Sequence, residues 1–177
     1  QYSKSFSQML MMAKFSNLFE NVNNIPILAD SPARFAIGSG PSKLNVHVFL
    51  SLSRIFFVLT FLGCPCTLQL HLACITSLDL TPNALNLGIT SPDGKITSIL
   101  TLFSSKTSSR TLHSDLYGAI SALQTKQEPY QEDIPLVPTS SLPLRLFLSS
   151  FHLNIFCFSQ ILSRSRVVKI SAGETFF

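Results

Sequence analysis

Four residues with metal-binding side chains lie close together in the sequence: Cys64, Cys66, His71 and Cys74, with the spacing C-x-C-x4-H-x2-C. A zinc site needs four converging ligands, and structural sites commonly place two to four residues between the cysteines of a pair. Here a single residue, the stiff Pro65, separates the first pair. We therefore interpret the cysteines as small apolar side chains in an apolar run, and we predict no metal site and no cofactor.

Motifs for covalent catalysis or phosphate binding are not found. The sequence contains no G-x-S-x-G elbow, P-loop, G-x-G-x-x-G or H-E-x-x-H. The stretch AIGSGPSK (36–43) lacks the Gly-Lys-Ser/Thr ending of a phosphate-binding loop and reads as a hairpin turn. His47 and His152 lie in apolar, strand-like runs, which favours a core or sheet-edge position. We predict a protein that is not an enzyme and has no small-molecule substrate.

Composition argues against a nucleic-acid partner. The chain has thirteen Lys and Arg and nine Asp and Glu, so its net positive charge reflects a shortage of carboxylates more than an abundance of basic residues. Only Arg164, Arg166 and Lys169 cluster, whereas binding through phosphates needs many such groups. Four cysteines without a secretion signal or an N-x-S/T sequon favour an intracellular compartment, cytoplasm or nucleus.

The first half of the chain divides into three expected units. Apolar spacing predicts an amphipathic helix at about residues 5–21, within an N-terminal unit of residues 1–32. Two alternating runs around a Gly/Pro-rich turn predict a hairpin at 33–48. Residues 49–69 then read as an apolar insert. The stretch 55–75 carries no Asp, Glu, Lys or Arg, and about 20 such residues are long enough to span a bilayer, although Pro65 and Gln69 weaken that interpretation.

Residues 74–103 have a clear strand-and-turn pattern. Leu85, Leu87 and Ile89 alternate along one run, which the triplet TPN (81–83) separates from the run before it. SPDG (91–94) has Pro at the first central position of a turn, followed by Asp-Gly, and leads into a third run. The pattern predicts a three-stranded antiparallel β-meander with one solvent-exposed face.

This order of residues resembles one blade of a WD-repeat β-propeller. The matching positions are His71, Pro82 with Asn83, Gly88, Asp93, Gly94 and His113. No Trp-Asp ends the third strand, and no Gly-His precedes the first. The resemblance implies a non-enzymatic scaffold that binds other proteins. It also implies a structural role for six of these blade positions: His71, Pro82, Gly88, Asp93, Gly94 and His113.

The remaining segments complete the expected organisation. The WD-like unit covers 70–123, in which RTLHSDLYGAISAL (110–123) fits either a strand or a helix. We favour a helix capped by Ser114, with Leu116, Ala119, Ile120 and Leu123 on one face. A Pro-rich linker follows at 124–143, and a second apolar insert with a C-terminal strand at 144–177.

The expected fold class is α+β and β-rich: an antiparallel β-meander resembling an incomplete propeller blade, an N-terminal helix, a second helix and poorly ordered apolar inserts. The expected function is a protein–protein interaction scaffold fragment with an unidentified protein partner. Two alternatives stay open. The chain is a conceptual or mis-spliced translation product with no evolved function, or a small single-pass membrane protein anchored by residues 55–75.

Overall fold

The computed structural model of the chain describes residues 25–38, 43–61, 64–134 and 154–164. The elements are β1 (Ile27–Ile37), β2 (Leu44–Ser51), β3 (Arg54–Phe61), β4 (Cys64–His71), the short 3-10 helix η2 (Leu72–Cys74), β5 (Ile75–Thr81), β6 (Ala84–Thr90), β7 (Thr97–Phe103), α2 (Lys106–Lys126) and α4 (Ile155–Arg164). The expected helix at 5–21 and the expected strand after residue 165 lie outside the described residues.

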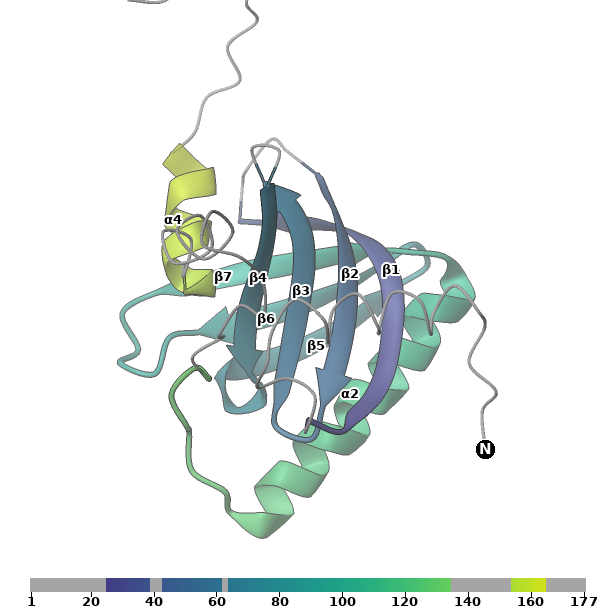
Figure 1. The fold of residues 1–177 in the computed structure, drawn as a ribbon. Coiled ribbons are helices and arrows are strands. Elements are labelled where there is room, and N and C mark those ends of the chain that lie inside the picture. Colours follow the sequence, from purple (N-terminus) through teal and green to yellow (C-terminus); the bar gives the residue numbers. More distant parts are fainter. Residues whose placement is uncertain (1–24, 39–42, 62–63, 135–153, 165–177) are drawn as a thin grey trace, which may run out of the picture.

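The seven strands of the described residues form one antiparallel sheet in the order β4-β3-β2-β1-β7-β6-β5. Strands that follow each other in sequence are paired, except β4 and β5, and an additional pairing of β1 with β7 joins β1–β4 to β5–β7. Figure 1 shows the consequence: β5–β7 cross behind β1–β4, so the sheet folds into two halves that face each other. Strands β4 and β5 form the two edges.

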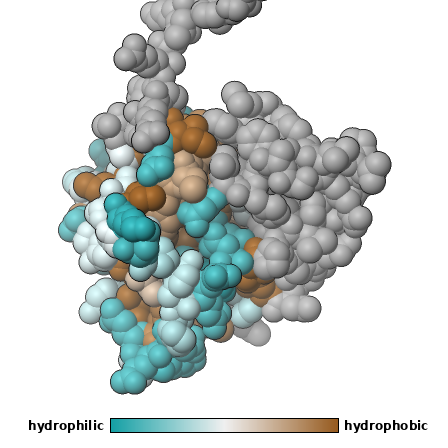
Figure 2. Space-filling model, turned by 90° about the vertical axis from the view of Figure 1, so that its left-hand side faces the viewer, coloured by the Kyte–Doolittle hydropathy of each residue, from teal (hydrophilic) through white to brown (hydrophobic). Residues whose placement is uncertain are grey.

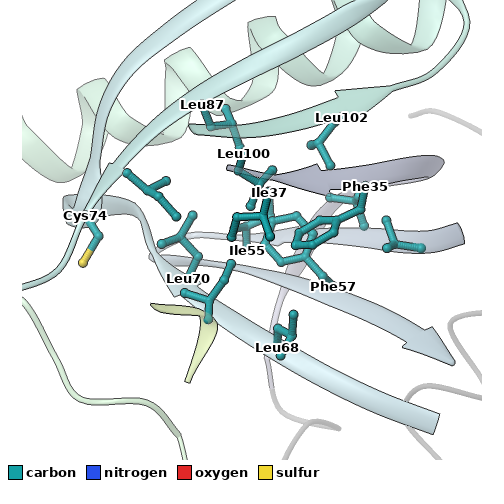
Figure 3. Packing of buried hydrophobic residues seen from close by; sticks show 14 of the residues in the cluster. Phe35, Ile37, Ile55, Phe57, Leu68, Leu70, Cys74, Leu87, Leu100 and Leu102 are labelled. Carbon is teal, nitrogen blue, oxygen red and sulfur yellow. The ribbon is translucent and has the colours of Figure 1, made fainter. Parts of the chain in front are cut away.

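The core fills the space between the two halves. In Figure 3, Leu87, Leu100 and Leu102 point from the second half toward Phe35 and Ile55 of the first half. The rings of Phe35 and Phe57 lie 5.4 Å apart, centroid to centroid, and both residues are fully buried. Burial of one apolar face on each half is the main force that holds the folded sheet together.

The prediction that residues 49–69 form a poorly ordered insert is wrong, because most of this range belongs to the regular strands β2, β3 and β4. Consecutive residues from Val46 to Ser51 are buried in β2, and the same holds for Arg54–Phe57 in β3 and Leu68–His71 in β4. Strands buried on both faces have near-continuous apolar sequences. That burial explains the long uncharged run that also suggested a membrane anchor at 55–75. No helix in the described part of the chain is long and apolar enough to cross a bilayer.

The predicted meander is confirmed as β5–β7. The predicted turn at 91–94 is present, with the Gly94 N–H donating to the Ser91 carbonyl at 2.8 Å. The Asp93 carboxylate also accepts hydrogen bonds from the Ser91 hydroxyl (2.6 Å) and the Lys95 N–H (3.1 Å). Gly94 has a φ of 71°, which an L side chain rarely adopts. At Gly88 the constraint is different, since a Cβ at this position would collide with the Ser77 hydroxyl unless that side chain turned away.

The helix favoured for the segment after the meander is present as α2, but its predicted start was wrong. Ser105, not Ser114, is the N-cap, and its hydroxyl accepts the Ser108 N–H at 3.2 Å. Gln127 ends the helix in the left-handed conformation. The buried stripe recurs every three or four residues and extends back beyond the predicted face: Ser109, Leu112, Leu116, Ala119 and Leu123.

The second expected apolar insert contains one described element, α4. Its residues Ile155, Phe156, Phe158 and Leu162 belong to the same hydrophobic core as the sheet, and the Phe158 ring lies 6.3 Å from that of Phe35. Figure 2 views the side of the molecule on which α4 lies. Apolar residues gather in the upper part of that face, and its lower part is mostly hydrophilic.

Candidate functional site

The six residues singled out by the blade pattern do not form one site. His71 is the last residue of β4, and Pro82 lies in the tight β5–β6 turn. Gly88 is in β6, and Asp93 and Gly94 are in the β6–β7 turn. His113 lies on α2, in the middle of a helix instead of beside a strand. Their positions are spread over the sheet, its turns and the helix.

The Cys and His residues that were considered as a metal site, and interpreted instead as apolar packing residues, have separate environments. His71 caps η2, with its Nδ1 accepting the Ala73 N–H at 3.2 Å, and Cys74 is a buried free thiol. Cys64 and Cys66 fall within β4, but their side chains lie outside the described part of the structure. Within that part, no three His, Cys, Asp or Glu side chains come together as ligands.

A buried polar cluster lies on the outer face of β3 and β4, where the 128–134 segment crosses these strands. The Gln69 amide binds the main chain of Ile134 twice, donating to its carbonyl at 2.6 Å and accepting its N–H at 3.0 Å. The Arg54 guanidinium donates to the Glu132 carbonyl at 2.7 Å. The Tyr130 ring lies edge-on to His71, 5.2 Å between centroids. These contacts hold an extended segment against the sheet and resemble no catalytic arrangement.

Burial governs protonation in this cluster. Desolvation lowers the pKa of His71, and the nearby Arg54 charge lowers it further, while Glu128 opposes both. Desolvation also raises the pKa of the Cys74 thiol to about 11 and raises the pKa of Asp133. A thiol that stays protonated is a poor nucleophile, so Cys74 is a packing residue in this environment.

His71 makes stability depend on pH. Because its pKa in the folded protein lies below the ordinary value of 6.5, the unfolded chain takes up a proton first as the pH falls. We therefore expect the free energy of unfolding to be unaffected by His71 above about pH 6.5 and to decrease below it, until His71 is also protonated in the folded state. Urea unfolding followed at half-unit pH steps between 7.5 and 5 measures this.

His71→Asn is the matched variant, because an amide oxygen keeps an acceptor for the Ala73 N–H and does not titrate. The unfolding energies of the two proteins should separate as the pH falls below 6.5. Comparing the two proteins removes the contribution of Asp133, whose raised pKa acts in the opposite direction. A constant difference between them across this range would contradict the assignment.

An open groove lies between β5 and α2. Its larger part has a volume of about 350 Å³, and a neighbouring hollow of about 180 Å³ shares Ile75, Ile120 and Gln124 with it. Residues 75–78 form one wall of the larger part. The other wall comes from α2 and consists of His113, Tyr117, Ile120, Ser121 and Gln124. The groove therefore follows the edge of the sheet, with β5 beside α2 (Figure 1).

Strand β5 presents main-chain groups at its outer edge. The β5–β6 loop has two residues, so its flanking pair, Thr81 and Ala84, is the first hydrogen-bonded pair of the hairpin. Alternation then directs the N–H and C=O of Leu80 and Leu78 away from β6. Among the described strands none pairs with this edge. The groove thus combines unused strand hydrogen-bonding groups with a side-chain surface.

Sequence reasoning did not identify the groove or the 128–134 segment. The groove depends on β5 being an edge, which follows from the β1–β7 pairing and has no local signature. The sequence did contain a sign of the role of Gln69, because a polar residue in an otherwise apolar strand requires a hydrogen-bond partner when it is buried. That partner, Ile134, is 65 residues away.

Comparisons with known proteins identify no family. No family model matches the chain, and no curated protein matches. Among solved structures, the C-terminal domain of an unknown Leishmania infantum protein matches with 13% identity and a TM-score of 0.45, over 60% of this chain and 98% of that one. The DH/PH domains of PDZ-RhoGEF in complex with activated RhoA match with 17% identity and a TM-score of 0.48, over 63% of this chain and 33% of that one. A DH/PH fragment of PDZRHOGEF in complex with human RhoA matches with 15% identity and a TM-score of 0.47, over 68% of this chain and 34% of that one.

The resemblance to a WD-repeat blade is wrong. The expected blade strands belong to a larger sheet. A propeller blade is a four-stranded sheet repeated around an axis. Here β5–β7 continue through β1 into β2–β4, forming one open sheet of seven strands. Short strands and turns rich in Pro, Asn, Asp and Gly are common to antiparallel meanders of many folds, so the local pattern was not specific to a propeller.

Proposed function

We propose that this chain is a non-enzymatic protein-interaction module that binds an extended segment of a protein partner along the outer edge of β5. The observation that carries the proposal is the groove between β5 and α2, which runs beside main-chain groups that no described strand uses. Addition of a strand to such an edge obtains affinity from main-chain hydrogen bonds and selectivity from side-chain pockets.

The lining of the groove suits this mode of binding. Ile75, Leu78 and Ile120 make its walls partly apolar, and Thr76 and Ser77 also line it. Exposed sheet edges associate readily unless a protein protects them. On this edge the exposed residues include Leu80 on β5 and Tyr117 on α2, so an apolar contact surface flanks the strand.

The test is selection of linear peptides from a random display library on the purified chain, followed by affinity measurement with two variants. Leu78→Pro removes an N–H that points out of the sheet, so the β5–β6 ladder is kept. Leu78→Ala removes a similar part of the side chain and keeps the N–H. We expect the Pro variant to weaken binding at least tenfold relative to the Ala variant, since a main-chain hydrogen bond is lost and the ring obstructs pairing.

Leu80→Pro provides a second edge variant at a more exposed position and should have the same effect. Circular dichroism and urea unfolding of each variant establish that the sheet is intact. The proposal fails if no peptide is enriched, or if both folded Pro variants bind the selected peptides as tightly as their parent.

A further inference from the structure

The charges around the groove indicate what kind of segment fits it. None of the residues that line its larger part is Asp, Glu, Lys or Arg. A charged side chain directed between β5 and α2 would lose hydration without gaining a partner of opposite charge. Side chains that enter the groove should therefore be uncharged, and Ile75, Leu78 and Ile120 favour aliphatic ones.

The opposite face of β5 favours a different kind of partner side chain. Side chains alternate along a strand, and the register places Ser77, Asp79 and Thr81 on the face away from the core. Asp79 is exposed, and no ion pair found among the described residues includes it. A strand paired with β5 would place one of its own outward side chains beside this carboxylate. Opposite charges in such a cross-strand position are mutually stabilising.

Resting on the proposed function, we infer that the partner is an amphipathic extended segment. Aliphatic side chains at every second position face α2, and hydroxyl or basic side chains lie between them, with a Lys or Arg beside Asp79. The absence of charged residues from the larger part of the groove and the outward carboxylate of Asp79 together specify the alternation. The partner's charged residues are confined to the positions that face solvent.

Three synthetic heptapeptides with blocked ends test the inference by calorimetric titration of the whole chain. The first alternates Val and Thr, with Val at both ends and Lys at the central Thr position. The second exchanges this Lys with a neighbouring Val, so the composition is unchanged and the charge now faces the groove. The third keeps Thr at the centre. We expect the first to bind at least tenfold more tightly than the second, and about twofold to fivefold more tightly than the third.

Asp79→Asn should remove the preference for the first peptide over the third and leave the affinity for the third unchanged. Equal affinity for the first two peptides, with loss of both in Leu78→Pro, would overturn the inference and leave strand addition intact. Failure of all three peptides, together with failure of the library selection, would remove the proposed function itself. Light scattering that finds a dimer disrupted by Leu78→Pro would assign the edge to a second copy of this chain, and would also overturn the inference.

Discussion

Replacing Phe35 by Ala is expected to lower the free energy of unfolding by about 3–5 kcal/mol, the usual range for a fully buried Phe. Phe35 is inaccessible to solvent and contacts an aromatic ring on each side, Phe57 of β3 and Phe158 of α4. Its removal leaves a cavity where the sheet meets α4, and a close-packed core closes such a cavity only partly. Urea unfolding monitored by far-ultraviolet circular dichroism measures the loss.

Two further variants test the explanation. Phe35→Leu retains most of the buried volume and should lose much less stability than Phe35→Ala. In a double-mutant cycle with Phe158→Ala, the two substitutions should be non-additive by at least about 0.5 kcal/mol, because their rings are in contact. A loss below about 1 kcal/mol for Phe35→Ala, or strict additivity with Phe158→Ala, would show that α4 does not pack on the sheet in this way.

Replacing Gln69 by Ala is expected to lower the free energy of unfolding by about 1–3 kcal/mol and to release the 128–134 segment from the sheet. The Gln69 side chain satisfies both main-chain groups of Ile134, and buried main-chain groups without partners are costly. The segment can reduce this cost by moving into water, so the larger signal should be faster hydrogen exchange in 128–134. Mass spectrometry of exchanged peptides measures the change.

Gln69→Glu distinguishes the two hydrogen bonds. A carboxylate still accepts the Ile134 N–H but cannot donate to its carbonyl. Gln124→Ala, on the groove side of α2, is a control expected to leave exchange in 128–134 unchanged. Unaltered exchange of the Ile134 amide in Gln69→Ala would refute the proposed attachment.

The elements that were predicted correctly depend on residues close together in the sequence. The turns at 81–83 and 91–94, the β5–β7 meander and the existence of α2 were all predicted from local sequence patterns. Their physical causes are local: the φ preference of Gly94, the hydrogen bonds that Asp93 accepts from Ser91 and Lys95, and the helical spacing of apolar residues. Short-range patterns of this kind do not specify what lies against each face.

The sequence by itself therefore determined the β-rich class, the meander and its turns, and one helix. Tertiary structure alone decided that β1 pairs with β7, that β3 and β4 are buried strands instead of an insert or a membrane anchor, and that β5 is an edge beside α2. The reason is that strand pairing and burial depend on contacts between distant residues, such as Phe35 with Leu102 or Gln69 with Ile134. A contact that stabilises two segments far apart in the chain produces no periodic pattern in the sequence of either segment.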